Sequence, residues 1–283
     1  MNLRTPATSF VAALDEPWRF LRTRFSMWAP AAFALAAMGV VPAVLVQWFM
    51  ARLTHVTPGA MPDLVSLVAL FPALFFFMLA YVATQLGAFV IATRVLAGER
   101  PNVGDVLATA LSPRMLLVGG VPLLLVLAGF GCVVGGPVAA ALVGFAPAAV
   151  LARPGVWFST WGEAFAAATV RASPRDAGPP GLKLAAITLV WYGVNSVAGQ
   201  LAAIPSLGWF VWSGINALGS GDILGALQSN PPFAIGATGV ILGAALRPFA
   251  DIFLAAGVVL LWRDLERVRG GEDLEALVDG RAT

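Results

Sequence analysis

Six stretches of apolar residues, separated by short polar segments, divide the chain. A helix rises about 1.5 Å per residue, so roughly 20 apolar residues are needed to cross a hydrocarbon core of about 30 Å. The stretches are Met27–Met50, Leu64–Leu96, Met115–Phe130, Val133–Ala152, Leu182–Ile204 and Phe233–Trp262. We therefore predict an all-α polytopic transmembrane bundle in which residues 1–283 form a single integral membrane domain and residues 27–262 contain about six spans.

Two of these stretches depart from a simple span. Leu64–Leu96 is longer than one crossing requires, so we expect it to tilt, to kink at Pro72 or to project beyond the bilayer. The third and fourth stretches are separated by a glycine-rich break, Gly131–Pro137. A tight hairpin of two spans fits this break, and so does one bent span.

The connection after the fifth stretch is predicted to be a long loop, Pro205–Pro232. It contains Trp209, Phe210 and Trp212, and such side chains favour the boundary between lipid and water. We expect this loop to lie against the outer surface of the membrane.

Three segments have the pattern of amphipathic helices lying in the membrane surface. They are Thr8–Phe25, Asn102–Leu111 and Val156–Ala172, and each precedes a pair of predicted spans. In the last segment, one apolar stripe comprises Trp157, Trp161, Phe165 and Ala168. Apolar and aromatic faces opposed by cations are typical of interfacial helices. We assign residues 1–26 to the first of these elements and residues 263–283 to a tail.

Composition and charge place the chain in a membrane and orient it. Of its residues, 59% are hydrophobic and 11% are charged, whereas a soluble domain carries about 25% charged residues. Six spans put 15 of the 17 lysines and arginines on one side, which the positive-inside rule makes cytoplasmic. We predict a bacterial inner-membrane protein with both termini in the cytoplasm. The lipid bilayer is its expected partner, and nucleic acid is not.

Known enzyme chemistries lack the residues they require. His55 is the only histidine and Cys132 the only cysteine, so histidine-based zinc sites and intrachain disulfides are excluded. The first apolar run is also longer than the roughly 7–15 residues of a signal peptide, so we expect it to be retained. We predict a protein without catalytic residues, metal or cofactor.

Polar residues inside the apolar stretches are the candidate functional residues. Arg247 and Asp251 are four residues apart in the last stretch, on one face of a helix. An arginine at the bilayer centre costs at least about 2.5 kcal/mol, so it should face the bundle interior. This pair fits a gating, ion-coupling or headgroup-binding site, and it also fits a self-neutralising structural pair. Secondary candidates are Gln85, Asn195 and Gln200.

The segment after the last stretch, LLWRDLERVRGGEDLEAL, resembles the ending of a group of bacterial membrane proteins. The group includes YciC-like proteins and the membrane domain that precedes some glycerophosphodiester phosphodiesterases. Matching positions are Asp264, Leu265, Asp273, Leu274 and Glu275. Trp262 replaces the usual tyrosine, and Glu266 stands where arginine is common. The resemblance implies a six-helix bundle with interfacial helices, and it implies no activity.

Two functions from different classes follow. The absence of catalytic residues and the amphipathic cytoplasmic segments favour a membrane scaffold or accessory subunit, which would bind a protein partner through the interfacial helices and the tail. The alternative is a transporter or channel for a small solute or lipid that uses Arg247 and Asp251. That alternative predicts a cavity that reaches Arg247.

Overall fold

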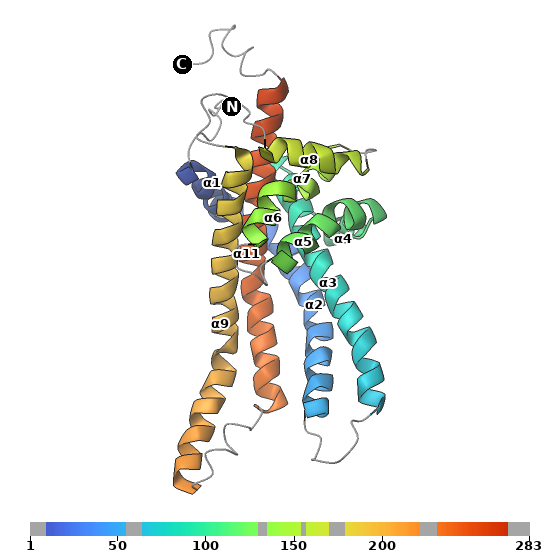
Figure 1. The fold of residues 1–283 in the computed structure, drawn as a ribbon. Coiled ribbons are helices and arrows are strands. Elements are labelled where there is room, and N and C mark those ends of the chain that lie inside the picture. Colours follow the sequence, from blue (N-terminus) through green and yellow to red (C-terminus); the bar gives the residue numbers. More distant parts are fainter. Residues whose placement is uncertain are drawn as a thin grey trace. The chain divides into compact units, whose positions relative to one another are not determined.

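The computed structural model describes residues 10–54, 64–129, 135–153, 157–169, 179–220 and 231–270. Every regular element in these ranges is a helix, so the prediction of an all-α fold is confirmed (Figure 1). His55, Cys132 and residues 271–283 of the predicted tail lie outside the described residues.

Five described segments are long and apolar enough to cross a membrane. Four are the helices α2 (Phe25–Thr54), α3 (Leu64–Leu96), α9 (Pro180–Ser220) and α11 (Phe233–Gly270), and the fifth is Gly135–Ala152. Large apolar side chains stay exposed along them; Phe71 is 68% exposed and Val211 64%. Lipid tolerates such surfaces and water does not, so the chain is a multi-pass membrane protein.

The third predicted span is the shortest. A π-helical turn, η1 (Met115–Gly120), leads into α5 (Val121–Gly129). This segment is long enough to cross a membrane only when α4 (Val103–Ala110) is counted with it. Because α4 is bent by 74° from that segment, the pair forms one broken span or a re-entrant element. The described chain thus has five spans, or six with the bent pair.

The glycine-rich break separates two helices that pack against each other. α5 lies against α6 (Gly135–Val143), and α6 is followed by α7 (Ala146–Ala152). A Cβ atom at Gly129 would lie 2.6 Å from the backbone carbon of Gly135, so only glycine allows the two helix ends this close. The two helices therefore form a hairpin, in which Gly135–Ala152 is long enough to span and α5 is long enough only together with η1 and the bent α4.

The predicted outer loop from Pro205 is wrong over its first part, because α9 continues through Pro205 to Ser220. A proline costs a helix one hydrogen bond, and membrane helices tolerate this loss. Trp209 and Trp212, placed in the loop by the prediction, pack against each other on the same helix with ring centroids 5.4 Å apart.

The three predicted amphipathic helices are present as α1 (Phe10–Thr23), α4 and α8 (Ser159–Thr169). α4 is capped at its N-terminus by Asn102, whose side chain accepts a hydrogen bond from the Gly104 amide at 2.9 Å. α8 buries a narrow face of small residues, namely Thr160, Ala164, Ala167 and Ala168. The predicted aromatic stripe is divided: Trp157 and Phe165 are exposed, while Trp161 donates a hydrogen bond to the Val118 carbonyl at 2.8 Å.

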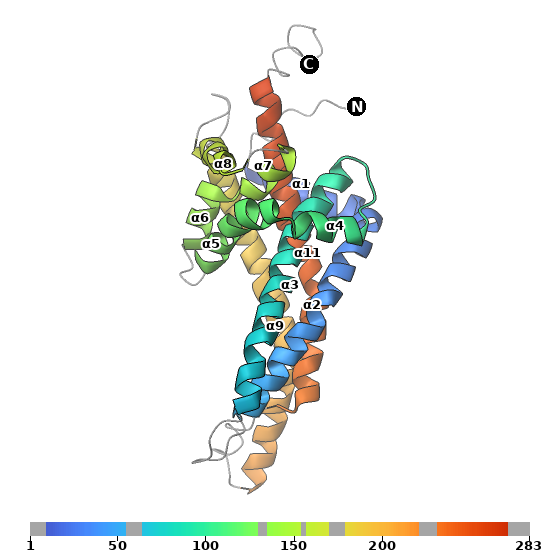
Figure 2. The same ribbon diagram turned by 90° about the vertical axis from the view of Figure 1, so that its right-hand side faces the viewer.

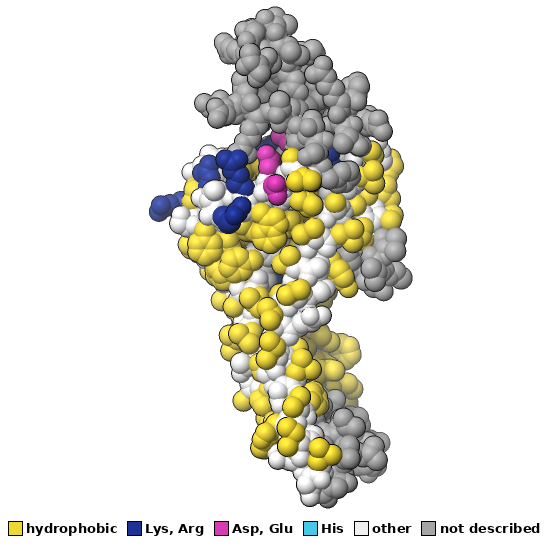
Figure 3. Space-filling model, turned by 90° about the vertical axis from the view of Figure 1, so that its left-hand side faces the viewer, with side chains coloured by type: hydrophobic (Ala, Val, Ile, Leu, Met, Phe, Trp, Pro, Cys, Tyr) yellow, Lys and Arg dark blue, Asp and Glu magenta, His cyan; other side chains and the backbone are white. Residues whose placement is uncertain are grey.

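The chain divides into two compact units. Unit 1 comprises Met1–Ala32, Gln85–Gly193 and Phe249–Thr283, and it includes the short helices α4 to α8 (Figure 2). Unit 2 comprises Phe33–Thr84 and Val194–Pro248, in which α2, α3, α9 and α11 each supply one segment. On the face in Figure 3, charged side chains gather over unit 1, and the surface of unit 2 is hydrophobic or uncharged.

Candidate functional site

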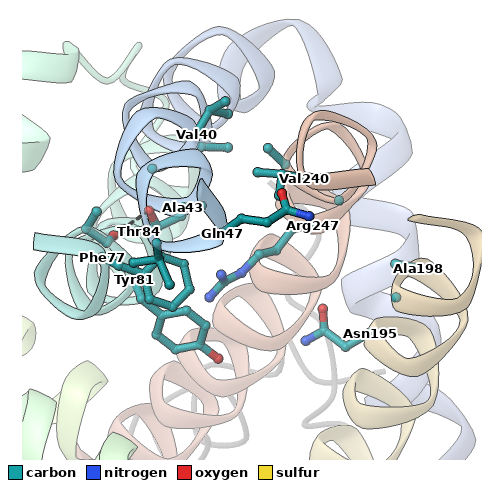
Figure 4. A pocket seen from close by; sticks show the side chains of 17 residues that line it. Val40, Ala43, Gln47, Phe77, Tyr81, Thr84, Asn195, Ala198, Val240 and Arg247 are labelled. Carbon is teal, nitrogen blue, oxygen red and sulfur yellow. Dashed lines mark hydrogen bonds between the residues drawn. The ribbon is translucent and has the colours of Figure 1, made fainter. Parts of the chain in front are cut away.

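A cavity of about 400 Å³ lies within unit 2, between the segments of α2, α3, α9 and α11 (Figure 4). Its walls carry many small residues, among them Gly39, Ala43, Ala80, Ala198 and Gly243. Where two helices touch, small side chains let their backbones come close together. Where the helices do not touch, the same small side chains leave space between them. The cavity is thus a consequence of small residues aligned on four helices.

The contacts around the cavity follow the same rule. A Cβ atom at Gly39 would lie 4.0 Å from that of Ala80, where α2 meets α3. A Cβ atom at Gly239 would lie 2.6 Å from the Ala202 carbonyl oxygen, where α11 meets α9. The small-residue spacing of Gly239 and Gly243 thus serves close packing within the chain.

Arg247 is the only charged residue among those that line the cavity. It lies on α11, directly before Pro248, and its guanidinium carbon is 3.7 Å from the centre of the Tyr81 ring on α3. Figure 4 shows the side chain reaching across the cavity toward that ring. A desolvated cation over an aromatic face gains about 2 kcal/mol.

Three uncharged polar side chains line the cavity beside Arg247 and Tyr81. The Thr84 hydroxyl donates to the Ala80 carbonyl at 2.8 Å, so its proton is already used. Asn195 points into the space from α9 (Figure 4). The Gln47 oxygen Oε1 is buried and accepts no hydrogen bond from the residues that the structure describes. The cavity therefore combines one cation and two amides with apolar walls.

A separate polar cluster lies inside unit 1. The Asp251 carboxylate is 2% exposed and accepts hydrogen bonds from Gln85 Nε2 at 2.6 Å and from Trp191 Nε1 at 3.4 Å. Gln85 and Trp191 are themselves 1% and 3% exposed. These bonds tie α11 to α3 and α9 and supply the buried carboxylate with donors.

The residues predicted from the sequence fall in three places. Arg247 and Asn195 line the cavity of unit 2, and Asp251 and Gln85 belong to the polar cluster of unit 1. Gln200 is exposed on α9 and does not line the cavity. Among the described residues no group of three or more histidine, cysteine or acidic side chains could hold a metal ion.

Two partners, Tyr81 and Trp191, were missed from the sequence. Tyr81 and Gln85 are four residues apart on α3, as Arg247 and Asp251 are on α11. That equal spacing was the available signal, because residues four apart lie on one helix face. Trp191 had no such signal, since its contact with Asp251 joins residues 60 positions apart.

No protein-family model, curated protein or solved structure was found to match the chain.

Proposed function

We propose that the protein is a membrane carrier that binds an anionic small solute or lipid in the cavity of unit 2. The observation that supports this proposal is the position of Arg247, the only charged side chain on the wall of a mostly apolar cavity. Ligand cavities measure roughly 300–1,000 Å³ and place a few polar groups among apolar walls. The cavity, at about 400 Å³, has the size and the lining of such a site.

The energetics favour an anion. A charged arginine within the apolar part of a membrane protein costs about 2.5–3.5 kcal/mol, and such residues commonly mark a substrate or ion pathway. The contact with Tyr81 offsets part of this cost. An anionic group bound beside the guanidinium would add a charge-assisted hydrogen bond, the strongest kind available to an arginine.

A transport assay with two matched variants tests the proposal. Arg247→Gln removes the charge from the cavity wall, and Arg52→Gln removes a comparable charge that lies over the Trp48 ring at 4.0 Å but does not line the cavity. In proteoliposomes loaded with radiolabelled anionic lipids or organic anions, we expect Arg247→Gln to abolish protein-dependent movement and Arg52→Gln to preserve it. Equal activity in both variants would overturn the proposal.

A scaffold or accessory subunit is the second candidate function. The exposed aromatic side chains of α8 and the residues before it favour it: Phe158 is 56% exposed and Phe165 48%. Such a face fits either a partner helix or the lipid headgroup region. Extraction in mild detergent distinguishes the two functions, because a scaffold would copurify with a stoichiometric partner and lose it on Phe158→Ser/Phe165→Ser substitution.

We also propose a bacterial inner-membrane location with both termini in the cytoplasm, and membership of the YciC-like group. The support is the basic asymmetry of the sequence and the charged surface of unit 1 (Figure 3). A fluorescent protein fused after Thr283 should fluoresce, and alkaline phosphatase fused there should stay inactive. The opposite pair of results would reverse the orientation. Absence of catalysis stays a prediction.

A further inference from the structure

The cavity is elongated and carries one positive charge, and these two features limit the classes of ligand that fit it. Resting on the proposed function, we propose that the ligand is a single-chain amphiphile with one anionic group. The anionic group binds beside Arg247, and the chain runs along the helices toward Gln47, which sets the length that fits.

The length follows from the lining residues. On α2 they extend from Ala36 to Gln47, eleven positions apart, which corresponds to roughly 16 Å of helix. On α11 they extend from Val240 to Arg247, which corresponds to roughly 10 Å. An inorganic anion has no apolar surface to bury against a wall of this length. At about 400 Å³ the cavity is also near the small end of ligand sites, which favours one chain over two.

The polar groups define the two ends. Gln47 abuts Gly236, because a Cβ atom at Gly236 would overlap with Gln47 Nε2. Gly236 precedes Arg247 by eleven positions on α11, a separation of roughly 16 Å along the helix. Arg247 and Gln47 therefore lie toward opposite ends of the cavity. Between them the walls are apolar, with residues such as Ala43, Val240 and Ala244.

The charge at one end selects the headgroup class. Arg247 is the only cation on the lining, and Asn195 can donate from its amide. A single oxyanion, either a carboxylate or a phosphate, complements this end, whereas a zwitterionic or cationic headgroup would bring a positive charge toward a guanidinium.

Gln47 lies toward the other end of the cavity, in contact with Gly236. Replacing Gly236 with alanine leaves no room for the amide where it stands, and the amide lines the cavity. Gly236→Ala should therefore push Gln47 into the cavity and shorten it, and Gln47→Ala should lengthen it. Gly208→Ala is the matched control, because a Cβ atom at Gly208 would meet nothing within 4 Å.

Binding to the full-length protein in nanodiscs, measured by native mass spectrometry, tests the inference. The probes are acetate and inorganic phosphate as headgroups alone, saturated fatty acids from eight to eighteen carbons, and lysophosphatidic acids of matched chains. We expect the headgroups alone not to bind, and one chain-length optimum among the amphiphiles. Arg247→Gln should weaken their binding roughly tenfold or more, as loss of a charge-assisted hydrogen bond does. Comparison of the fatty acids with the lysophosphatidic acids identifies the headgroup.

The variants separate failure of the inference from failure of the proposed function. Gly236→Ala should move the optimum to shorter chains, Gln47→Ala to longer chains, and Gly208→Ala should leave it in place. Acetate or phosphate binding as tightly as the amphiphiles, with loss in Arg247→Gln, would overturn the inference and preserve the function. If the chain-length optimum were unchanged in both Gly236→Ala and Gln47→Ala, the assignment of Gln47 as the end of the ligand's acyl chain would be overturned. Indifference of every probe to Arg247→Gln would overturn both proposals.

Discussion

Unit 1 and unit 2 share the helices α2, α3, α9 and α11 but pack them by different means. The largest fully buried side chains of the described protein, including Trp28, Phe89, Phe145 and Phe253, all belong to unit 1. In unit 2, Leu35 is the only described residue of leucine size or larger that is buried. Its helices meet through small residues and border a cavity instead.

This difference separates stability from binding. A core of interlocking side chains loses stability when even one methylene group is removed. Helices that meet through glycine and alanine, by contrast, can leave space beside their contacts. We infer that unit 1 supplies most of the structural stability and that unit 2 keeps the space in which a ligand binds.

The largest expected effect comes from deleting the same side chain in each unit. Phe253, 0% exposed and 4.8 Å from the Trp18 ring, should cost about 3 kcal/mol or more when replaced by alanine. Phe75 in unit 2 is 64% exposed, so Phe75→Ala should cost well under about 1 kcal/mol. The two variants are compared by measuring, with gel filtration in one detergent, the fraction of protein that stays folded as the temperature is raised. Equal losses would contradict the division of roles.

A smaller effect is expected from the buried carboxylate of unit 1. Asp251→Ala leaves Gln85 and Trp191 without this acceptor, which should cost about 2 kcal/mol. Asp105 is the control, because its ion pair with Arg94 at 3.4 Å is exposed and worth less than about 1 kcal/mol. The same heating assay measures both. If Asp251→Ala were as stable as Asp105→Ala, the polar cluster would have no structural role.

The smallest effect probes the packing of unit 2. Gly239→Ala brings a methyl group to 2.6 Å from the Ala202 carbonyl oxygen, so α9 and α11 must separate at a cost of about 1–2 kcal/mol. Gly208→Ala, with open space around it, should be neutral or slightly stabilising because alanine favours helix. Melting temperatures of the two variants decide this. A neutral Gly239→Ala would mean that close backbone contact is not needed there.

The sequence predicts the spans well because a span is a local property. The length of the apolar runs alone locates α2, α3 and α11, and the amphipathic period locates α1, α4 and α8. Prediction failed after Pro205, where a proline and three aromatic residues suggested a loop although the apolar helix continues. Proline weakens a helix within a membrane less than in water, because surrounding groups satisfy the freed carbonyl.

The site was predictable only in part. Arg247 and Asp251 stood out because a charge inside an apolar run is rare, and Gln85 and Asn195 because amides there are uncommon. That Arg247 and Asp251 contribute to different environments was not predictable. Their partners Tyr81 and Gln85 come from α3, more than 160 positions away, and no local pattern encodes that pairing.

The central claim is that an anionic amphiphile occupies the cavity beside Arg247, and photo-crosslinking tests it directly. A fatty acid with a diazirine in its chain, irradiated with the protein in nanodiscs, should label cavity residues such as Ala43 and Val240. The labelling should be competed by unlabelled fatty acid and lost in Arg247→Gln, but preserved in Arg52→Gln. Labels confined to lipid-exposed residues such as Phe75 and Val211, and unchanged in Arg247→Gln, would contradict the claim.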